Sequence, residues 1–192
     1  MKRTVFLDRD GVINQDSPLY IKTCDEFEFL PGSIEAIKLL ARHNYDVILI
    51  TNQSVIGRGM VTMEGLDAIF SKMTRMVEEA GGKIKDIYFC PHTPEDQCDC
   101  RKPKPGMILS ATRRYNIDPG RSVMIGDSAK DILCARSAGV GCAVLVLTGN
   151  GHVALDKLKN GPEQKKPDHV AEDLLSAVTW LIEKDSGHLL HD

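Results

Sequence analysis

Short apolar runs alternate along the chain with longer segments in which apolar residues recur every three or four positions. The short runs, rich in β-branched residues, are typical of strands buried on both faces of a parallel sheet. The longer segments have helical spacing, and Pro or Gly marks several of their ends. This pattern predicts five strands, at residues 4–7, 47–51, 87–90, 123–126 and 143–147, and five helices, at residues 33–42, 63–79, 106–114, 129–138 and 171–183.

The alternation of strands and helices predicts an open, doubly wound α/β fold, in which ligands bind at the carboxyl ends of the parallel strands. We expect residues 1–184 to form a single domain, without a cap domain because only one helix fits between the first two strands. Residues 150–168 are rich in Gly, Lys and polar residues, which favours a surface connection. Residues 185–192 are expected to form a flexible tail.

The composition narrows the class of protein. The 192 residues are 42 % hydrophobic and carry a net charge of −3. This charge does not indicate the large positive surface that would attract nucleic acid. No apolar run approaches the roughly 20 residues that span a bilayer, and charged residues from Asp8 onward interrupt the apolar start before a signal peptide can develop. We therefore expect a cytoplasmic monomer that binds a small molecule and neither nucleic acid nor membrane.

Two carboxylates follow the first predicted strand. Asp8 and Asp10 would point to the same side because extended residues alternate faces, and Gly11 permits a sharp exit. Like charges so close need a shared proton or a cation between them, and Mg²⁺ prefers carboxylate oxygen. By itself the tetrapeptide Asp-Arg-Asp-Gly would fit a solvated turn equally well.

Polar residues also follow the second strand, where hydroxyl and amide groups could bind a phosphate: Thr51, Asn52, Gln53 and Ser54. Asp127 follows the fourth strand, and Asp131 follows about one helical turn later. By itself, Asp127 would fit equally well as the N-cap of the next helix. Arg101 and Lys102, in a Pro-rich loop, could neutralise the oxygens of a transferred phosphoryl group. Each feature alone has an ordinary structural explanation, but three of the four places lie at predicted strand ends, and Arg101 and Lys102 come just before the helix predicted to start at residue 106.

In this order, the four places resemble the four motifs of the haloacid dehalogenase superfamily along nearly the whole chain. The resemblance implies that Asp8 attacks phosphorus and forms an aspartyl-phosphate. It implies that Asp10, starting protonated, serves as general acid and then as general base. An aspartate at position 10 is typical of the phosphatases of this superfamily.

The same resemblance implies roles for the other motifs. Thr51 and Asn52 would donate hydrogen bonds to the phosphate, and Lys102 would steady the nucleophile and the phosphoryl oxygens. Mg²⁺ would be held by Asp8, Asp127 and the backbone carbonyl of Asp10. Asp131 is interpreted as a residue of the helix start.

A second metal site is predicted within residues 90–100. Three thiols and one imidazole suit a tetrahedral, structural zinc site: Cys90, His92, Cys98 and Cys100. The alternative is a chance group of cysteines beside a surface histidine. Because this loop leads directly into Arg101 and Lys102, zinc would hold those cations over the phosphate pocket. Three further cysteines lie singly in apolar or helical surroundings and receive no function: Cys24, Cys134 and Cys142.

The motifs together with Arg-Lys-Pro-Lys-Pro-Gly-Met resemble one subfamily, which contains histidinol-phosphate phosphatase and D-glycero-D-manno-heptose 1,7-bisphosphate 7-phosphatase. The Pro-Gly-Met sequence and the stand-alone chain favour the heptose enzyme. The short cysteine loop and Ser128 directly after Asp127 argue against it. The resemblance thus implies a phosphorylated sugar as substrate, with the heptose 7-phosphate ahead of histidinol phosphate or another small sugar phosphate.

Two further classes stay open. A zinc-bearing interaction module without catalysis would have the same fold, although the retained motif residues argue against it. A nucleic-acid 3′-phosphatase would be expected to have stacking aromatics, and aromatics are only 5 % of this chain. In the heptose case a second phosphate would be bound by loop residues such as Gln53, Ser54, Arg101 or Arg58. For Arg58 the interpretation as a solvated arginine in a flexible loop is preferred.

Overall fold

The computed structural model describes residues 3–159, 161–162 and 165–188. Six parallel strands form one sheet in the order β3-β2-β1-β4-β5-β6. The strands are β1 (Thr4–Leu7), β2 (Asp46–Asn52), β3 (Asp86–Cys90), β4 (Val123–Gly126), β5 (Cys142–Val146) and β6 (His169–Ala171). The helices are α1 (Ser33–Arg42), α2 (Met63–Glu79), α3 (Gly106–Tyr115), α4 (Ala129–Ser137), α5 (Gly151–Lys159) and α6 (Leu174–His188).

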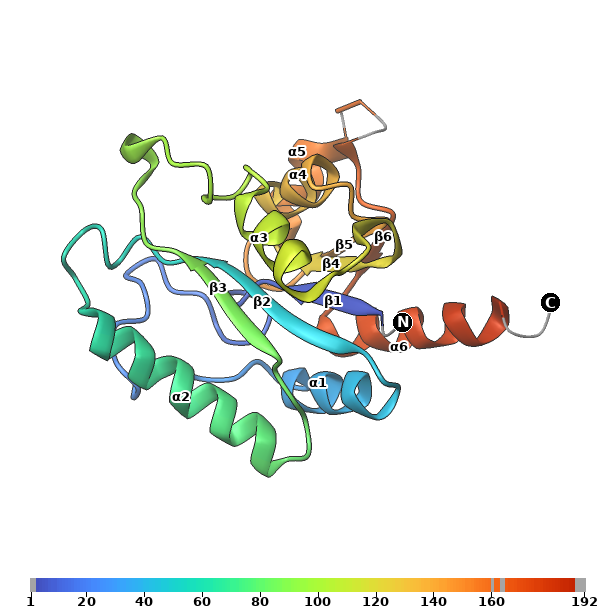
Figure 1. Cartoon of the computed structure of the whole chain (residues 1–192), viewed down its shortest axis with the longest axis horizontal. Coiled ribbons are helices and arrows are strands. Elements are labelled where there is room, and N and C mark those ends of the chain that lie inside the picture. The colour runs from blue at the N-terminus through green and yellow to red at the C-terminus, as the bar shows by residue number, and fades with distance from the viewer. Residues whose placement is uncertain (1–2, 160, 163–164, 189–192) are drawn as a thin grey trace.

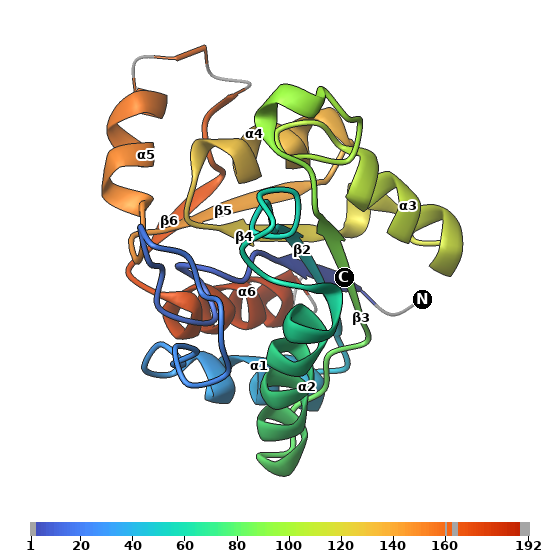
Figure 2. The same cartoon turned by 90° about the vertical axis from the view of Figure 1, so that its left-hand side faces the viewer.

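The sheet lies between two layers of helices. Helices α1, α2 and α6 cover one face, and α3, α4 and α5 cover the other (Figures 1 and 2). Alternate residues of each strand enter different cores: Val5 and Leu7 pack with the first layer, while Phe6 packs with the second. All three are fully buried. This two-sided burial explains why the strands are continuous apolar runs in the sequence.

Three parts of the predicted architecture need correction. Residues 151–159, expected to be a surface connection, form α5, whose buried stripe is limited to Gly151, Ala154 and Leu158. Residues 169–171 form the short edge strand β6, so the last helix begins at Leu174 and not at residue 171. That helix continues through residues 185–188 of the expected tail, while residues 189–192 lie outside the described part of the chain. Within that part, none of the helices combines the length and apolar character needed to span a membrane.

The strand order determines where a site can form. The chain places β2 and β3 on one side of β1, and β4, β5 and β6 on the other. Connections that leave the carboxyl ends of β1 and β4 therefore diverge and open a crevice between them. Within the described chain, the connections from β1 to α1 and from β2 to α2 contain no inserted domain over this crevice.

Candidate active site

Three carboxylates meet at the carboxyl ends of the two central strands. Asp8 directly follows β1, Asp127 directly follows β4, and Asp131 lies in the first turn of α4. One oxygen from each lies within 4.8 Å of the others, and all three residues are buried. The sequence placed Asp8 and Asp127 here, but it gave Asp131 only the role of a helix-start residue.

Lys102 is the cation of this cluster. Its Nζ lies 2.8 Å from Asp8 Oδ1 and 2.6 Å from Asp131 Oδ1, and it donates a hydrogen bond to the carbonyl of Ile50 at 2.8 Å. Burial alone would lower the pKa of Lys102, but the charges of Asp131 and Asp8 outweigh it and hold that pKa above its ordinary value. Lys102 is therefore a fixed positive charge beside Asp8.

Asp131 has a second function, which explains why the sequence suggested a simpler one. Its Oδ2 accepts hydrogen bonds from the backbone N and the Oγ of Ser128, at 3.0 and 2.6 Å. These bonds form a capping box at the start of α4. The same carboxylate thus starts the helix with one oxygen and binds Lys102 with the other.

The cluster carries more negative than positive charge. Burial raises the pKa of Asp8 to about 8. The charge of Lys102 opposes this rise, and the charges of Asp131 and Asp127 add to it. Burial, followed by the charge of Asp131, raises the pKa of Asp127 to about 7. One lysine does not balance three buried carboxylates, so the site has the donor set and the charge that suit a hard divalent cation such as Mg²⁺.

Two glycines allow the backbone to close around Asp127. Gly11 and Gly149 both have positive φ, and a Cβ atom on either would lie 2.2 Å from Asp127 Oδ2. The same oxygen accepts a hydrogen bond from the backbone N of Asn150 at 2.7 Å. Sequence analysis missed Asn150, although it too follows a strand of the sheet, β5, within a few residues.

Asp10 is held differently from Asp8. Its carboxylate accepts hydrogen bonds from the Arg9 guanidinium at 2.7, 2.9 and 3.1 Å, from Asn14 Nδ2 at 2.9 Å and from Gln53 Nε2 at 2.9 Å. Burial alone would raise the pKa of Asp10, but these contacts, chiefly the charge of Arg9, hold it below its ordinary value. The arrangement favours an ionised Asp10, in contrast to the protonated starting form expected from the sequence.

A pocket of about 480 Å³ opens over these residues. Nearly all of the sequence-predicted catalytic and phosphate-binding residues line it: Asp8, Asp10, Thr51, Asn52, Ser54, Arg101, Lys102 and Asp127. Its wall also contains Arg58 and two lysines from α4 and α5, Lys130 and Lys157. Gln53 is not part of this lining and is only 3 % exposed, so it does not lie where a substrate contact was expected.

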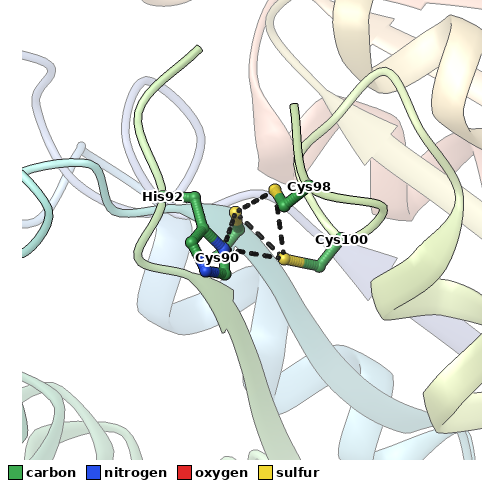
Figure 3. Close-up of side chains that lie close together, drawn as sticks. All are labelled: Cys90, His92, Cys98 and Cys100. Atoms are coloured by element: carbon green, nitrogen blue, oxygen red, sulfur yellow. Dashed lines mark hydrogen bonds between the residues drawn. The ribbon is translucent and has the colours of Figure 1, made fainter. Parts of the chain in front are cut away.

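The four predicted zinc ligands converge at the end of β3. Figure 3 shows the side chains of Cys90, His92, Cys98 and Cys100 pointing toward one another. Five of the six pairs of ligand atoms lie 3.2 to 3.6 Å apart, with His92 contributing Nδ1. Ligands about 2.3 Å from a tetrahedral zinc would be about 3.8 Å apart, so the cluster is close to the size such an ion needs.

The cysteine loop is joined to the active-site loops by hydrogen bonds. Arg101 Nη1 donates to the carbonyl of His92 at 3.0 Å. The backbone N of Lys102 donates to Asn52 Oδ1 at 3.0 Å, and Asn52 Nδ2 donates back to the Lys102 carbonyl at 3.2 Å. Asn52 therefore fixes the backbone beside Lys102 with part of its hydrogen-bonding capacity.

Comparisons with known proteins agree with this fold and site. Residues 99–177 match the family model of HAD-hydrolase-like proteins. The chain is 40 % identical to the D-glycero-β-D-manno-heptose-1,7-bisphosphate 7-phosphatase of Neisseria meningitidis serogroup A, over 96 % of this chain and 97 % of that protein. It is 42 % identical to the protein of the same name from Bordetella bronchiseptica, over 95 % and 99 % of the two chains.

A solved structure gives the same result. The D,D-heptose 1,7-bisphosphate phosphatase of B. bronchiseptica, crystallised with magnesium and phosphate, superposes with a TM-score of 0.87 at 40 % identity. The match covers 95 % of this chain and 99 % of that one. With the carboxylate and lysine cluster at the strand ends, these findings show that the chain belongs to the haloacid dehalogenase superfamily, in the same family as these phosphatases.

Proposed function

We propose that this protein removes the 7-phosphate of D-glycero-D-manno-heptose 1,7-bisphosphate and releases heptose 1-phosphate, a precursor of lipopolysaccharide or S-layer glycan. One observation carries the proposal: a buried carboxylate, Asp8, lies 2.8 Å from a buried lysine in the pocket of a chain closely similar to phosphatases with this substrate. The reaction would proceed through an aspartyl-phosphate on Asp8.

In the first step, an oxygen of Asp8 attacks phosphorus and the bond to the sugar oxygen breaks. Lys102 Nζ and the backbone N of Arg9 both contact Asp8 Oδ1, at 2.8 and 2.7 Å, and so fix the rotation of the nucleophile. Orientation of this kind supplies much of the rate gain in phosphoryl transfer. Lys102 also offsets negative charge on the phosphoryl oxygens.

Asp10 carries the proton in both steps. A phosphate dianion beside Asp10 raises its pKa by charge repulsion, which favours protonation when substrate binds. Asp10 then gives this proton to the departing sugar oxygen. In the second step it takes a proton from the water that attacks the aspartyl-phosphate, the bond between phosphorus and Asp8 breaks, and inorganic phosphate leaves with Asp8 restored.

The carboxylates of Asp8 and Asp127, together with the backbone carbonyl of Asp10, would hold Mg²⁺. The carboxylate of Asp131 lies close to those of Asp8 and Asp127 and would add negative charge beside the ion. When bound, the ion would supply positive charge that offsets the negative charge of the carboxylates and of the phosphoryl group. Its presence in the similar B. bronchiseptica structure supports this proposal. The residues of this chain fit it because their buried negative charge exceeds that of Lys102.

Zinc would occupy the Cys90, His92, Cys98 and Cys100 cluster in a structural role. Burial, followed by the hydrogen bond with Cys100, raises the pKa of Cys90 to about 12, so a bound cation is what would stabilise the thiolate. The ligands lie outside the active-site pocket. Zinc would therefore act on catalysis only by fixing the loop that leads into Arg101.

The second phosphate of the substrate would meet the positive wall of the pocket, formed by Arg58, Arg101, Lys130 and Lys157. Loops and helix ends would select the substrate in place of a cap domain. We further propose that the protein acts as a single-domain monomer, and this domain extends past residue 184 because α6 continues to His188. We also propose that it is cytoplasmic, because a reducing compartment keeps the cysteine ligands available.

The proposed substrate is tested by phosphate release from heptose 1,7-bisphosphate and histidinol phosphate, each with Mg²⁺. We expect kcat/KM for the heptose bisphosphate to exceed that for histidinol phosphate by at least about 100-fold, equivalent to about 2.7 kcal/mol. Asp8→Asn should lose nearly all turnover and keep its far-UV circular dichroism. Equal rates on both substrates would refute the substrate, and an active Asp8→Asn protein would refute the nucleophile.

The charge imbalance is tested by Asp127→Asn in buffer without divalent cations. Unfolded Asp ionises near about 4, whereas the folded pKa of Asp127 is about 7, so the folded protein holds an extra proton between these values. Wild type should therefore lose stability as the pH rises from about 4 to about 7. Asp127→Asn has no carboxylate to ionise at this position and does not lose this stability. At pH 8 its Tm should exceed that of wild type by about 2–4 °C for each kcal/mol difference in the free energy of unfolding.

At pH 5 the difference between the two proteins should shrink. Adding Mg²⁺ at pH 8 should reverse it, because wild type retains the carboxylate that binds the ion. An Asp127→Asn protein that melts no higher than wild type at pH 8 without Mg²⁺ would contradict the proposed charge imbalance.

The structural role of zinc is tested by Cys98→Ser, with Cys24→Ser as the matched control. Cys98→Ser should lose about one zinc per chain by elemental analysis and about tenfold or more in kcat, because the loop before Arg101 loses its anchor. Cys24→Ser should keep both. Full zinc content in Cys98→Ser would show that this cluster is not the zinc site.

A further inference from the structure

Gln53 was expected to contact substrate, but its amide is already engaged inside the protein. Gln53 Nε2 donates to Asp10 Oδ2 and to Thr51 Oγ1, both at 2.9 Å. A glutamine amide nitrogen has two hydrogens, so both of its donors are used. The opposite orientation of the amide would place its oxygen against the Asp10 carboxylate and is therefore disfavoured.

The backbone holds Gln53 in this position. Its N–H donates to the carbonyl of Cys90 at 2.7 Å, at the point where β2 and β3 both end. The side chain is 3 % exposed and lies behind the pocket, while its neighbours Asn52 and Ser54 line the pocket itself. The Gln53 amide thus contacts Asp10 from the protein interior and not from the pocket.

Three side chains together determine where the Asp10 carboxylate lies. Arg9 and Asn14 both bind Oδ1, and Arg9 also binds Oδ2. Arg9 and Asn14 are at most 1 % exposed, so removing either would also disrupt the core. Among the side chains that the structure describes, Gln53 is the one that reaches Asp10 from the loop after β2, and it links this loop to the loop after β1.

We propose that Gln53 is a positioning residue for Asp10. Its amide fixes the carboxylate at the distance and angle that proton transfer needs, and it does not bind substrate. This inference rests on the proposed role of Asp10 as general acid and base. Proton transfer requires hydrogen-bond reach, and a displacement of about 1 Å can cost about 100-fold in rate.

The test uses Gln53→Met, which keeps the volume and removes the amide, with the exposed glutamine variant Gln15→Met as control. With heptose 1,7-bisphosphate or another alkyl phosphate as substrate, Gln53→Met should lower kcat by about tenfold or more and change KM by less than about twofold. Gln15→Met should match wild type.

On p-nitrophenyl phosphate the expected signature differs. The leaving group needs little protonation, so aspartyl-phosphate forms quickly, while its hydrolysis still needs Asp10 as base. Gln53→Met should therefore release a burst of about one p-nitrophenolate per active site before a slow steady state. A raised KM with unchanged kcat and no burst would instead make Gln53 a substrate-binding residue and overturn the proposal.

Crystal structures supply a readout that does not depend on activity. In Gln53→Met and in the isosteric Gln53→Glu, whose carboxylate would repel Asp10, the Asp10 side chain should move away from its wild-type position. An unmoved Asp10 in both variants would overturn the proposal. If wild type hydrolysed no phosphate ester, the proposed function would fail, but the crystal structures would still decide the role of Gln53.

Discussion

The ammonium group of Lys102 is the contact on which the rest of the site depends. It joins Asp8 after β1, the Ile50 carbonyl in β2 and Asp131 at the start of α4, so three elements meet at one buried charge. A buried lysine without such partners would be strongly destabilising, because desolvation of a charge in the interior is costly. The same pairing that stabilises Lys102 also orients the proposed nucleophile.

That arrangement leaves negative charge that a further cation would balance. Asp127 adds a third carboxylate beside Asp8, and glycines at positions 11 and 149 let the backbone close around it. Two protein networks of opposite character therefore lie at the pocket where the phosphate is proposed to bind. The Asp8 network is rich in negative charge and suits a metal, whereas the Asp10 network contains Arg9 and amide donors and favours an ionised, fixed carboxylate.

The sequence predicted most of the sheet because its strands are buried on both faces and appear as continuous apolar runs. It predicted the Asp8 and Asp127 positions because carboxyl ends of parallel strands converge on one edge. Helix α5 escaped prediction, since its buried stripe of Gly151, Ala154 and Leu158 is narrow within a Lys-rich segment. The direction of the Gln53 amide depends on burial and on long-range hydrogen bonds, which no local pattern encodes.

Asp8 is the proposed nucleophile, and the whole mechanism depends on this assignment. The most direct measurement is mass spectrometry of the Asp10→Asn protein, quenched with borohydride after mixing with p-nitrophenyl phosphate. Borohydride converts an aspartyl-phosphate to homoserine, and hydrolysis should be slow without the Asp10 base. We expect homoserine at position 8. An unmodified Asp8 in a sample that has released about one p-nitrophenolate per site, or homoserine at another aspartate, would contradict it.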